Sequence, residues 1–286
     1  MEIKAYAKIN LSLDVTGKME NGYHSIESVM QSISLYDMVT LSDRDDREIV
    51  VSCDNPTIPP GPDNLAYKAA YVLLKELGLK RGVGISLKKN IPVASGLAGG
   101  STDAAAVLRG LNRLWGLTLR VDDLTAIGAV VGADVPFCIR GGTMLAAGIG
   151  DKLKPISTSA TIWYVLVSPG LQVSTKETYR KFDDLHHIFR RPDTPSLVKA
   201  LEAGDVESVA QNLCNVLEEV TLSEYKELRD IKGEILKAGA LGALMSGSGS
   251  SLFGIARDEE DARRICKRLR DRDLGAYVAS SVQDIG

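Results

Sequence analysis

A glycine-rich segment from Pro92 to Asp103 has the residue types that could hold a phosphate group. Its glycines lack a Cβ atom, so the backbone can approach a ligand closely and adopt positive φ values; they are Gly96, Gly99 and Gly100. The Ser-Thr-Asp run at 101–103 is typical of a helix start, where free N–H groups and the helix dipole favour an anion. The segment predicts a polyphosphate site, although the same pattern also occurs in ordinary strand-to-helix turns.

This segment matches neither of the two common glycine motifs for nucleotides. No Gly-Lys-Ser/Thr follows its glycines, so it is not a Walker A loop. The Gly-x-Gly-x-x-Gly dinucleotide fingerprint is absent as well. A nucleotide held here would therefore use a less common fold.

Two charged residues lie among apolar neighbours and are candidates for proton transfer or charge stabilisation. Lys8 occurs in an alternating, strand-like stretch, where a lysine usually faces water. Asp134 is set among small and apolar residues and precedes Val135-Pro136. It could be a partly desolvated carboxylate whose pKa is tuned by its neighbours, or it could simply cap or end a helix.

Other polar clusters have simpler interpretations. A second glycine-serine segment, Met245 to Ser251, is flanked by apolar residues and predicts a tight connection between strands, unless it is a flexible turn. The bases from Arg263 to Arg272 follow an acidic helix start on an amphipathic pattern, so they are interpreted as a solvated helix face. The pair Arg190-Arg191 is interpreted as a solvated charge cluster in a loop.

Composition limits the class of protein. The 286 residues, 44% hydrophobic and 25% charged, are typical of one large or two ordinary globular domains. A net charge of −3 argues against a general nucleic-acid binder. The four cysteines are scattered, which disfavours a disulfide framework or a cysteine metal site. No apolar run reaches about 18 residues and no apolar signal core is visible, so a cytoplasmic protein without a membrane partner is expected.

Alternating strands and helices must position these segments. Strand-like patterns cover 2–15 in two pieces, 26–41, 49–53, 83–91, 141–147, 162–167 and 276–282. Helical patterns cover 64–77, 104–115, 121–131, 174–182, 196–203, 205–217, 223–237 and 259–272. The polar stretch 151–160 is predicted to lack regular structure and to mark a soft domain boundary.

Three segments, in this order, resemble the three motifs of the GHMP kinase superfamily, whose members phosphorylate small metabolites with ATP. They are Ala7-Lys8-Ile9-Asn10-Leu11, Pro92 to Asp103, and Met245 to Ser251. Two further segments narrow the resemblance to a branch that acts on a cytidyl diphosphate sugar alcohol; they are Gly22-Tyr23-His24 and Gly132-Ala133-Asp134-Val135-Pro136. Five ordered segments across nearly the whole chain are far more specific than one glycine loop.

The middle motif departs from the superfamily pattern at two positions. The superfamily commonly has Gly-Leu-Gly-Gly-Gly-Ser-Ser, whereas this chain has Ala98 and Thr102 in place of a glycine and the second serine. Both changes are small, and Thr102 keeps its hydroxyl group. The alanine predicts that a positive φ is not essential at position 98.

The resemblance implies an α+β, two-domain GHMP kinase fold. The expected parts are an N-terminal ribosomal-protein-S5-like domain at 1–155 and a C-terminal ferredoxin-like α/β sandwich at 156–286, with the site in the cleft between them. It also implies a monomer or weak homodimer that acts on a small-molecule substrate and binds no nucleic acid.

The resemblance further implies transfer of the γ-phosphoryl group of ATP to the tertiary 2-hydroxyl of a methylerythritol unit. Asp134 would accept the hydroxyl proton or orient the hydroxyl, and Lys8 would keep that carboxylate ionised and stabilise the transferring phosphoryl group. Mg²⁺ would be held mainly by phosphate oxygens, with Ser101 or Thr102 nearby and no dedicated protein metal site. The triphosphate would contact Pro92, Val93, Ala94, Ser95, Gly96, Leu97, Ala98, Gly99, Gly100, Ser101 and Thr102.

Substrate recognition is assigned on the same basis to Asn10, Tyr23, His24 and Tyr179. Tyr23 would stack on the cytosine ring, with Tyr179 as the second aromatic side chain. Asn64 and Lys68 are candidates for the adenine end of ATP. The segment 247–250 would close on the phosphates or shape the cleft.

Three alternatives remain open at this point. A sister kinase for homoserine or mevalonate shares the glycine loops, and the Tyr23-His24 pair and Gly-Ala-Asp-Val-Pro argue against it. A nucleotide-binding sensor without catalysis is disfavoured because Lys8 and Asp134 are both present. An RNA-binding protein on a similar fold is disfavoured by the acidic balance and the absence of basic–aromatic clusters.

Overall fold

The protein is described here by a computed structural model that covers residues 1–20 and 22–286. Its first sheet has the strand order β3-β4-β2-β1-β8, with β5 paired to β2 and β6 to β5. Its second sheet has the order β11-β7-β10-β9. The strands are β1 Glu2–Lys18, β2 His24–Arg44, β3 Ile49–Cys53, β4 Gly82–Lys88, β5 Thr143–Gly148, β6 Lys152–Pro155, β7 Trp163–Val167, β8 Cys214–Asn215, β9 Gly242–Met245, β10 Leu252–Ala256 and β11 Ala276–Ser280.

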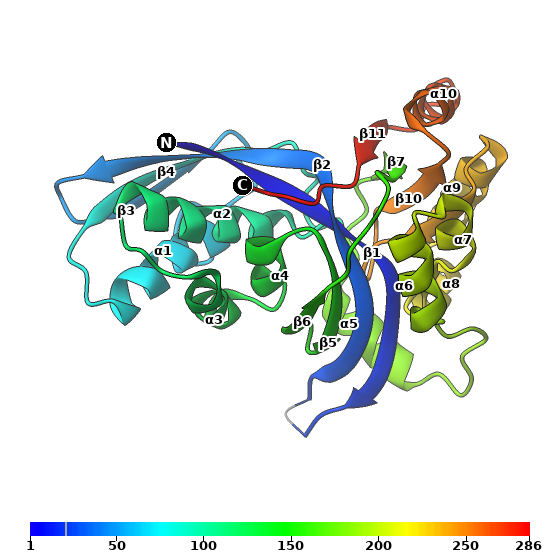
Figure 1. The fold of residues 1–286 in the computed structure, drawn as a ribbon, viewed down its shortest axis with the longest axis horizontal. Coiled ribbons are helices and arrows are strands. Elements are labelled where there is room, and N and C mark those ends of the chain that lie inside the picture. Colours follow the sequence, from blue (N-terminus) through cyan, green and yellow to red (C-terminus); the bar gives the residue numbers. More distant parts are fainter. Residues whose placement is uncertain (21) are drawn as a thin grey trace.

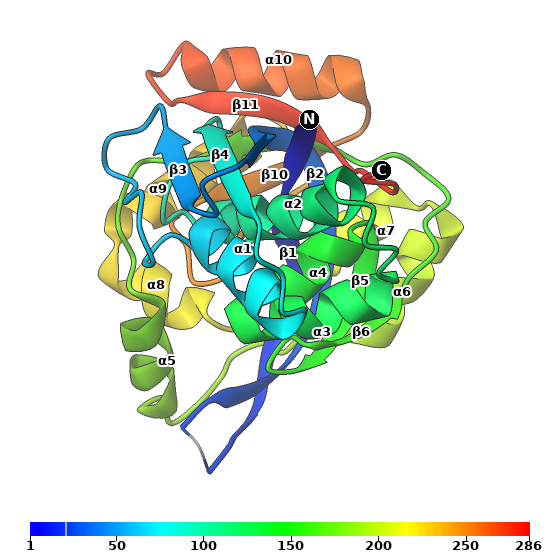
Figure 2. The same ribbon diagram turned by 90° about the vertical axis from the view of Figure 1, so that its left-hand side faces the viewer.

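Helices cover these sheets in two groups (Figure 1). The first group lies against the first sheet: α1 Leu65–Glu76, α2 Gly99–Leu114, α3 Val121–Val131 and α4 Val135–Arg140. The second group follows β7 along the chain: α5 Thr175–Asp183, α6 Thr194–Ala203, α7 Val206–Gln211, α8 Glu218–Glu224, α9 Lys226–Lys237 and α10 Glu259–Arg270. Turning the molecule shows α10 running alongside β11 (Figure 2). No helix in the described chain combines the length and apolar character that crossing a membrane requires.

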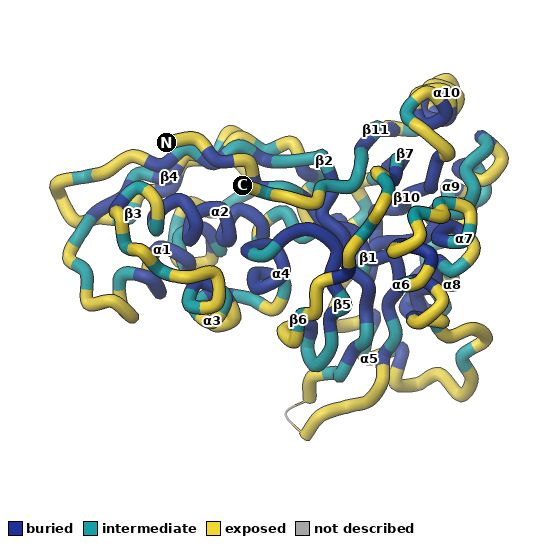
Figure 3. The backbone as a smooth tube through the Cα atoms, in the orientation of Figure 1, coloured by how far each residue is buried: buried dark blue, intermediate teal, exposed yellow. Residues whose placement is uncertain are grey.

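The strand β1 is continuous, so the prediction of two separate pieces is wrong. It pairs with β2 in antiparallel register, and the register shifts between Tyr6 and Lys8 and again between Asn10 and Ser12. Such bulges twist a strand locally and redirect its side chains. Residues 7–13 are all buried, because this part of β1 is covered on both faces (Figure 3). Lys8 therefore does not lie on a solvent-exposed face of the strand, so the usual interpretation, that a lysine in a strand faces water, does not apply.

Several short elements differ from the sequence prediction. The stretch 151–160 contains β6, a polar edge strand whose only neighbour in the described sheet is β5. The helix predicted over 205–217 ends at Gln211, and β8 then pairs in parallel with β1 through Cys214 and Asn215. The helix predicted over 223–237 is divided into α8 and α9 at Tyr225. Because β8 joins the first sheet from the second half of the chain, the boundary at residue 155 stays a prediction.

Candidate active site

The glycine-rich loop joins β4 to α2, as the sequence indicated, but α2 begins at Gly99 rather than at residue 104. The residue that caps it is Ala98, with φ 59° and ψ 30°, which is the left-handed conformation. The prediction that position 98 needs no positive φ is therefore wrong, because the turn into α2 imposes it and the alanine tolerates about 1–2 kcal/mol of strain. Since alanine has no side chain to cap a helix, the N–H groups of the first turn remain for another acceptor, such as a phosphate.

The second glycine-serine segment packs directly on this loop. Ser246 Oγ donates to the carbonyl oxygen of Gly96 at 2.9 Å, and the N–H of Ser251 donates to the carbonyl oxygen of Ser95 at 2.9 Å. The segment is the predicted tight connection, between β9 and β10. Its backbone is also held by Asn215, whose Nδ2 donates to the carbonyl oxygens of Met245 at 2.8 Å and Gly247 at 2.7 Å. These contacts exclude the interpretation as a flexible turn.

Lys8 and Asp134 meet beside the glycine-rich loop. The N–H of Lys8 donates to the carbonyl oxygen of Leu97 at 3.2 Å, so the strand and the loop are joined at this residue. Lys8 Nζ lies 3.7 Å from Asp134 Oδ2, and the two side chains are 6% and 36% exposed. The carboxylate is thus open to a substrate while the ammonium is not. Asp134 occupies the N-cap position of α4 but makes no capping hydrogen bond with its side chain, which leaves the carboxylate available.

Asn10 holds the Lys8 ammonium through a hydrogen bond. Lys8 Nζ donates to Asn10 Oδ1 at 2.8 Å, and Asn10 Nδ2 donates to Ser28 Oγ at 2.8 Å. Asn10 is 1% exposed, so its amide is used inside the protein. Its predicted contact with the substrate stays a prediction, and the observed contacts assign it at least the task of orienting Lys8.

The structure brings His24 and Tyr179 together. Their ring centroids are 4.9 Å apart with the planes 30° from parallel, and His24 Nε2 hydrogen-bonds Asp183 Oδ1 at 2.7 Å. Burial, with a smaller contribution from the charge of Asp134, raises the pKa of Tyr179 well above its ordinary value. Tyr23 is 61% exposed. Its predicted stacking with a base is not tested by these contacts.

Sequence reasoning missed Asp183. Its carboxylate also accepts a hydrogen bond from Lys18 Nζ at 2.5 Å, which fastens the turn end of the β1–β2 hairpin to α5. The available signal was spacing, because Asp183 follows Tyr179 by one helical turn and therefore lies on the same face of α5. A carboxylate in that position can fix which nitrogen of His24 carries the proton.

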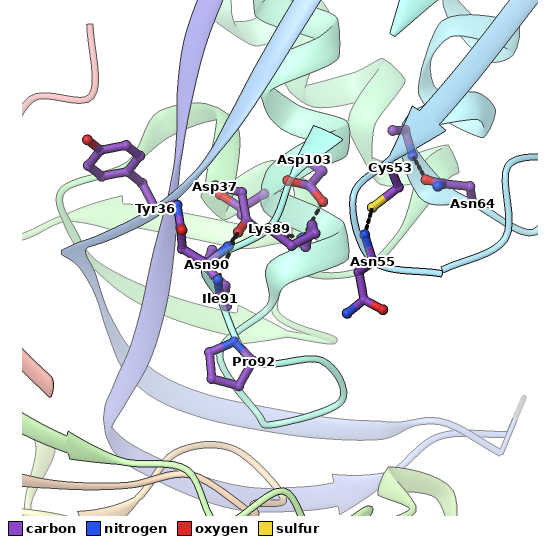
Figure 4. Close-up of polar contacts among 12 residues, drawn as sticks. Tyr36, Asp37, Cys53, Asn55, Asn64, Lys89, Asn90, Ile91, Pro92 and Asp103 are labelled. Atoms are coloured by element: carbon purple, nitrogen blue, oxygen red, sulfur yellow. Dashed lines mark hydrogen bonds and ion pairs between the residues drawn. The ribbon is translucent and has the colours of Figure 1, made fainter. Parts of the chain in front are cut away.

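A buried cluster of Asp37, Lys89 and Asp103 lies at the base of the glycine-rich loop (Figure 4). Lys89 Nζ donates to Oδ2 of both carboxylates. Oδ1 of Asp37 accepts the N–H groups of Asn90 and Ile91, which lead into the loop. Oδ1 of Asp103 is buried and has no hydrogen-bond partner among the described residues. The cluster ties both ends of the loop to β2, and it combines two carboxyl groups with one ammonium.

This cluster makes stability depend on pH. Burial raises the pKa of Asp103 to about 7, against the attraction of the Lys89 ammonium and with the repulsion of Asp37. A carboxyl whose pKa is higher in the folded than in the unfolded protein stabilises the fold fully below about pH 4 and loses that contribution as the pH rises to about 7. We therefore expect Asp103→Asn to gain thermal stability over the natural protein as the pH rises from 5 to 8. Because one pKa unit is worth about 1.4 kcal/mol, the difference in Tm should grow by several degrees.

Calorimetry of both proteins at four pH values checks this expectation. Asp261→Asn is a suitable control, because Asp261 is also a buried carboxylate but lies on α10 and faces Arg257 and Arg264. A difference in Tm that stays constant between pH 5 and 8 for Asp103→Asn would contradict the assignment.

Two family models and several known proteins match this chain. A family model described as the GHMP kinases N terminal domain matches residues 64–142, and the GHMP kinases C terminal model matches residues 197–273. The chain is 47% identical over 282 residues to the 4-diphosphocytidyl-2-C-methyl-D-erythritol kinase of Acetivibrio thermocellus, covering 99% of both chains. It is also similar to a crystal structure of 4-(cytidine 5'-diphospho)-2C-methyl-D-erythritol kinase, with a TM-score of 0.83, 34% identity and coverage of 99% and 100%.

The chain is also similar in fold to a solved structure of lower sequence identity. A crystal structure of homoserine kinase from Cytophaga hutchinsonii superposes with a TM-score of 0.77 at 21% identity, covering 99% of this chain and 94% of that one. Together with the two sheets and their helices, these findings confirm the predicted α+β GHMP kinase fold.

Proposed function

Because this chain belongs to the GHMP kinases and, within them, to the 4-diphosphocytidyl-2-C-methyl-D-erythritol kinases, we propose that the residues around Lys8 and Asp134 phosphorylate that compound. The reaction is ATP-dependent phosphorylation of the 2-hydroxyl group, in non-mevalonate isoprenoid precursor biosynthesis. The observation that carries the site assignment is the position of the 36% exposed Asp134 carboxylate, 3.7 Å from the buried Lys8 ammonium and next to the glycine-rich loop.

Asp134 is assigned to the acceptor hydroxyl. A carboxylate that is open on one side and makes no capping bond can accept a hydrogen bond from that hydroxyl and take its proton as the bond to phosphorus forms. Lys8 stands behind it with a fixed ammonium, held by Asn10. Positive charge at this place balances the carboxylate and the negative charge that moves through the transferring phosphoryl group.

The triphosphate is assigned to the loop and to the first turn of α2. Ala94, Gly96 and Ala98 have positive φ values. Backbone of this kind can direct successive N–H groups toward an anion. The N-terminus of α2, which no side chain caps, adds the partial positive charge of the helix dipole. This donor set suits phosphate oxygens, so the residues present fit ATP.

Mg²⁺ would neutralise part of the phosphate charge when bound. The described residues contain no group of three or more His, Cys, Asp or Glu side chains that could hold a metal ion. Thr102 donates its hydroxyl to the carbonyl oxygen of Tyr6 and is 2% exposed, so Ser101 is the better placed of the two predicted hydroxyls. Binding mainly through phosphate oxygens and water is our proposal, because Mg²⁺ usually keeps several waters and binds through substrate phosphates. A cytoplasmic location and a monomeric or weakly dimeric state also stay predictions.

The substrate's cytidyl end is assigned to His24, Tyr179 and Tyr23. The rings of His24 and Tyr179 contact each other, and Asp183 hydrogen-bonds His24. Aromatic rings can stack on a base.

The test is release of ADP with Mg-ATP and four acceptor conditions: 4-diphosphocytidyl-2-C-methyl-D-erythritol, homoserine, mevalonate and buffer alone. We expect turnover with the cytidyl compound only. Turnover with homoserine or mevalonate would overturn the substrate assignment and leave the assignment of the kinase fold unchanged. ATP binding without turnover on any acceptor would favour the sensor that has lost catalysis.

A further inference from the structure

Lys68 reaches from α1 to the end of α3. Its Nζ donates a hydrogen bond to the carbonyl oxygen of Val131 at 2.8 Å. Val131 is the last residue of α3, which has two acidic residues in its first turn and no basic residue in its last turn. The last carbonyl groups of a helix lack partners within the helix and carry partial negative charge. Lys68 thus brings to this end of α3 the cation that the helix itself does not contain.

The turn that follows Val131 carries Asp134. In it, the N–H of Gly132 donates to the carbonyl oxygen of Gly128 at 3.1 Å, and the N–H of Val135 donates to that of Gly132 at 3.2 Å. The Asp134 side chain makes no capping bond to α4. Beyond its ion pair with Lys8, the position of the Asp134 carboxylate depends on how the backbone of this turn is held. Lys68 holds the residue from which the turn starts.

The same turn of α1 also lies close to the start of α2. A Cβ atom built on Gly100 would lie 3.5 Å from Leu65 Cδ1, which is ordinary van der Waals distance. Leu65 and Lys68 are three positions apart and therefore neighbours on one helix face. One turn of α1 thus lies between the first turn of the phosphate-binding helix and the backbone that leads to Asp134.

We propose that Lys68 is a positioning residue, which fixes the Gly132-to-Asp134 turn, and with it the Asp134 carboxylate, relative to the triphosphate loop. The proposal rests on the proposed function, in which Asp134 faces the acceptor hydroxyl. It gives Lys68 a task at the chemical step through the hydrogen bond to Val131. The ammonium has three N–H donors, so the predicted contact with adenine stays a prediction. Phosphoryl transfer depends on in-line geometry, so a displaced carboxylate lowers kcat more than it weakens the binding of ATP.

Three variants test this. Lys68→Met removes the donor and keeps the length of the side chain. Lys68→Arg keeps a cationic donor, and Lys75→Met makes the same chemical change on the same helix at an exposed residue. We expect Lys68→Met to lower kcat by roughly tenfold to a hundredfold, with KM for ATP within about twofold of the natural protein. Lys68→Arg should recover most of the loss, and Lys75→Met should show none.

Combining Lys68→Met with Asp134→Asn separates positioning from other roles. If Lys68 acts through Asp134, its removal should cost nothing further in kcat once the carboxylate is gone, as single-turnover measurements can show. If Lys68→Met lowers kcat of the Asp134→Asn variant by the same factor as it lowers kcat of the natural protein, the proposal is overturned. So would a rise in KM for ATP at unchanged kcat, or a lower Tm at unchanged kcat. If Asp134→Asn alone retains the natural kcat, the proposed role of Asp134 fails instead, which is a separate result.

Discussion

Asp134→Asn is expected to lower kcat by about 10²- to 10⁴-fold while KM for ATP changes little. The amide keeps the size and polarity of the carboxylate but cannot accept a proton, so the loss reports proton acceptance or the orientation of the hydroxyl by charge. ATP binding should survive because hydrogen bonds from Lys8, Ser246 and Ser251 hold the loop at 92–102, and this substitution leaves them in place. The fold should survive too, since the carboxylate is 36% exposed and its ion pair spans 3.7 Å.

Steady-state kinetics with the cytidyl acceptor, together with ATP titration and thermal melting, check this prediction. Asp151→Asn is a matched control, because it removes a carboxylate that is exposed in the turn after β5. A loss of less than about tenfold in Asp134→Asn would remove this residue from the chemical step. A large rise in KM for ATP at normal kcat would instead assign it to nucleotide binding.

Local signals made much of the framework predictable. Asn64 accepts the N–H of Ala66 and Ser174 accepts that of Glu177, so α1 and α5 begin where polar capping residues precede a helical pattern. The loop after β9 was likewise readable, because small polar residues lie between two apolar runs. In each case the residues that decide the structure are neighbours in sequence.

The parts that were missed depend on distant contacts. The burial of Lys8 follows from cover on both faces of β1, and β8 exists only because Cys214 and Asn215 meet that strand. Short α4 begins beside Pro136, in a segment too brief to show helical periodicity. The same limit applies to the site, where Lys89 joins carboxylates at 37 and 103 that no local pattern connects.

Ala98 shows that the residue type can also mispredict the backbone conformation. The residue type argued for an ordinary conformation, yet the turn places it at φ 59°. The contacts that hold the loop, from Asp37 at its base and the β9–β10 connection at its side, impose this conformation against the preference of the side chain. Strain of this kind gathers at ligand-binding turns because the surrounding structure over-determines them.

Gly96→Ala tests whether the two glycine loops must touch. A Cβ atom at this position would lie 2.2 Å from the carbonyl oxygen of Ser246 and 3.0 Å from that of Gly249. Both are backbone atoms, so no side chain can rotate away. Gly96 also has φ 80°, which an alanine adopts only with strain. We expect the free energy of unfolding to fall by about 2–4 kcal/mol, from overpacking and backbone strain together.

The same change should weaken ATP binding, because the loop must move away from Ser246 and will lose the shape that directs its N–H groups inward. Gly100→Ala is the control for stability: an added Cβ there meets only Leu65 Cδ1 at 3.5 Å, and its backbone is helical. Denaturant unfolding and ATP titration of both variants measure the effects. If Gly96→Ala is as stable as Gly100→Ala and binds ATP like the natural protein, the junction of the two loops is not what shapes the proposed triphosphate site. If Gly96→Ala loses both properties while Gly100→Ala stays stable, the C-terminal half of the chain is needed to form the loop that we propose binds the triphosphate, which lies in the N-terminal half.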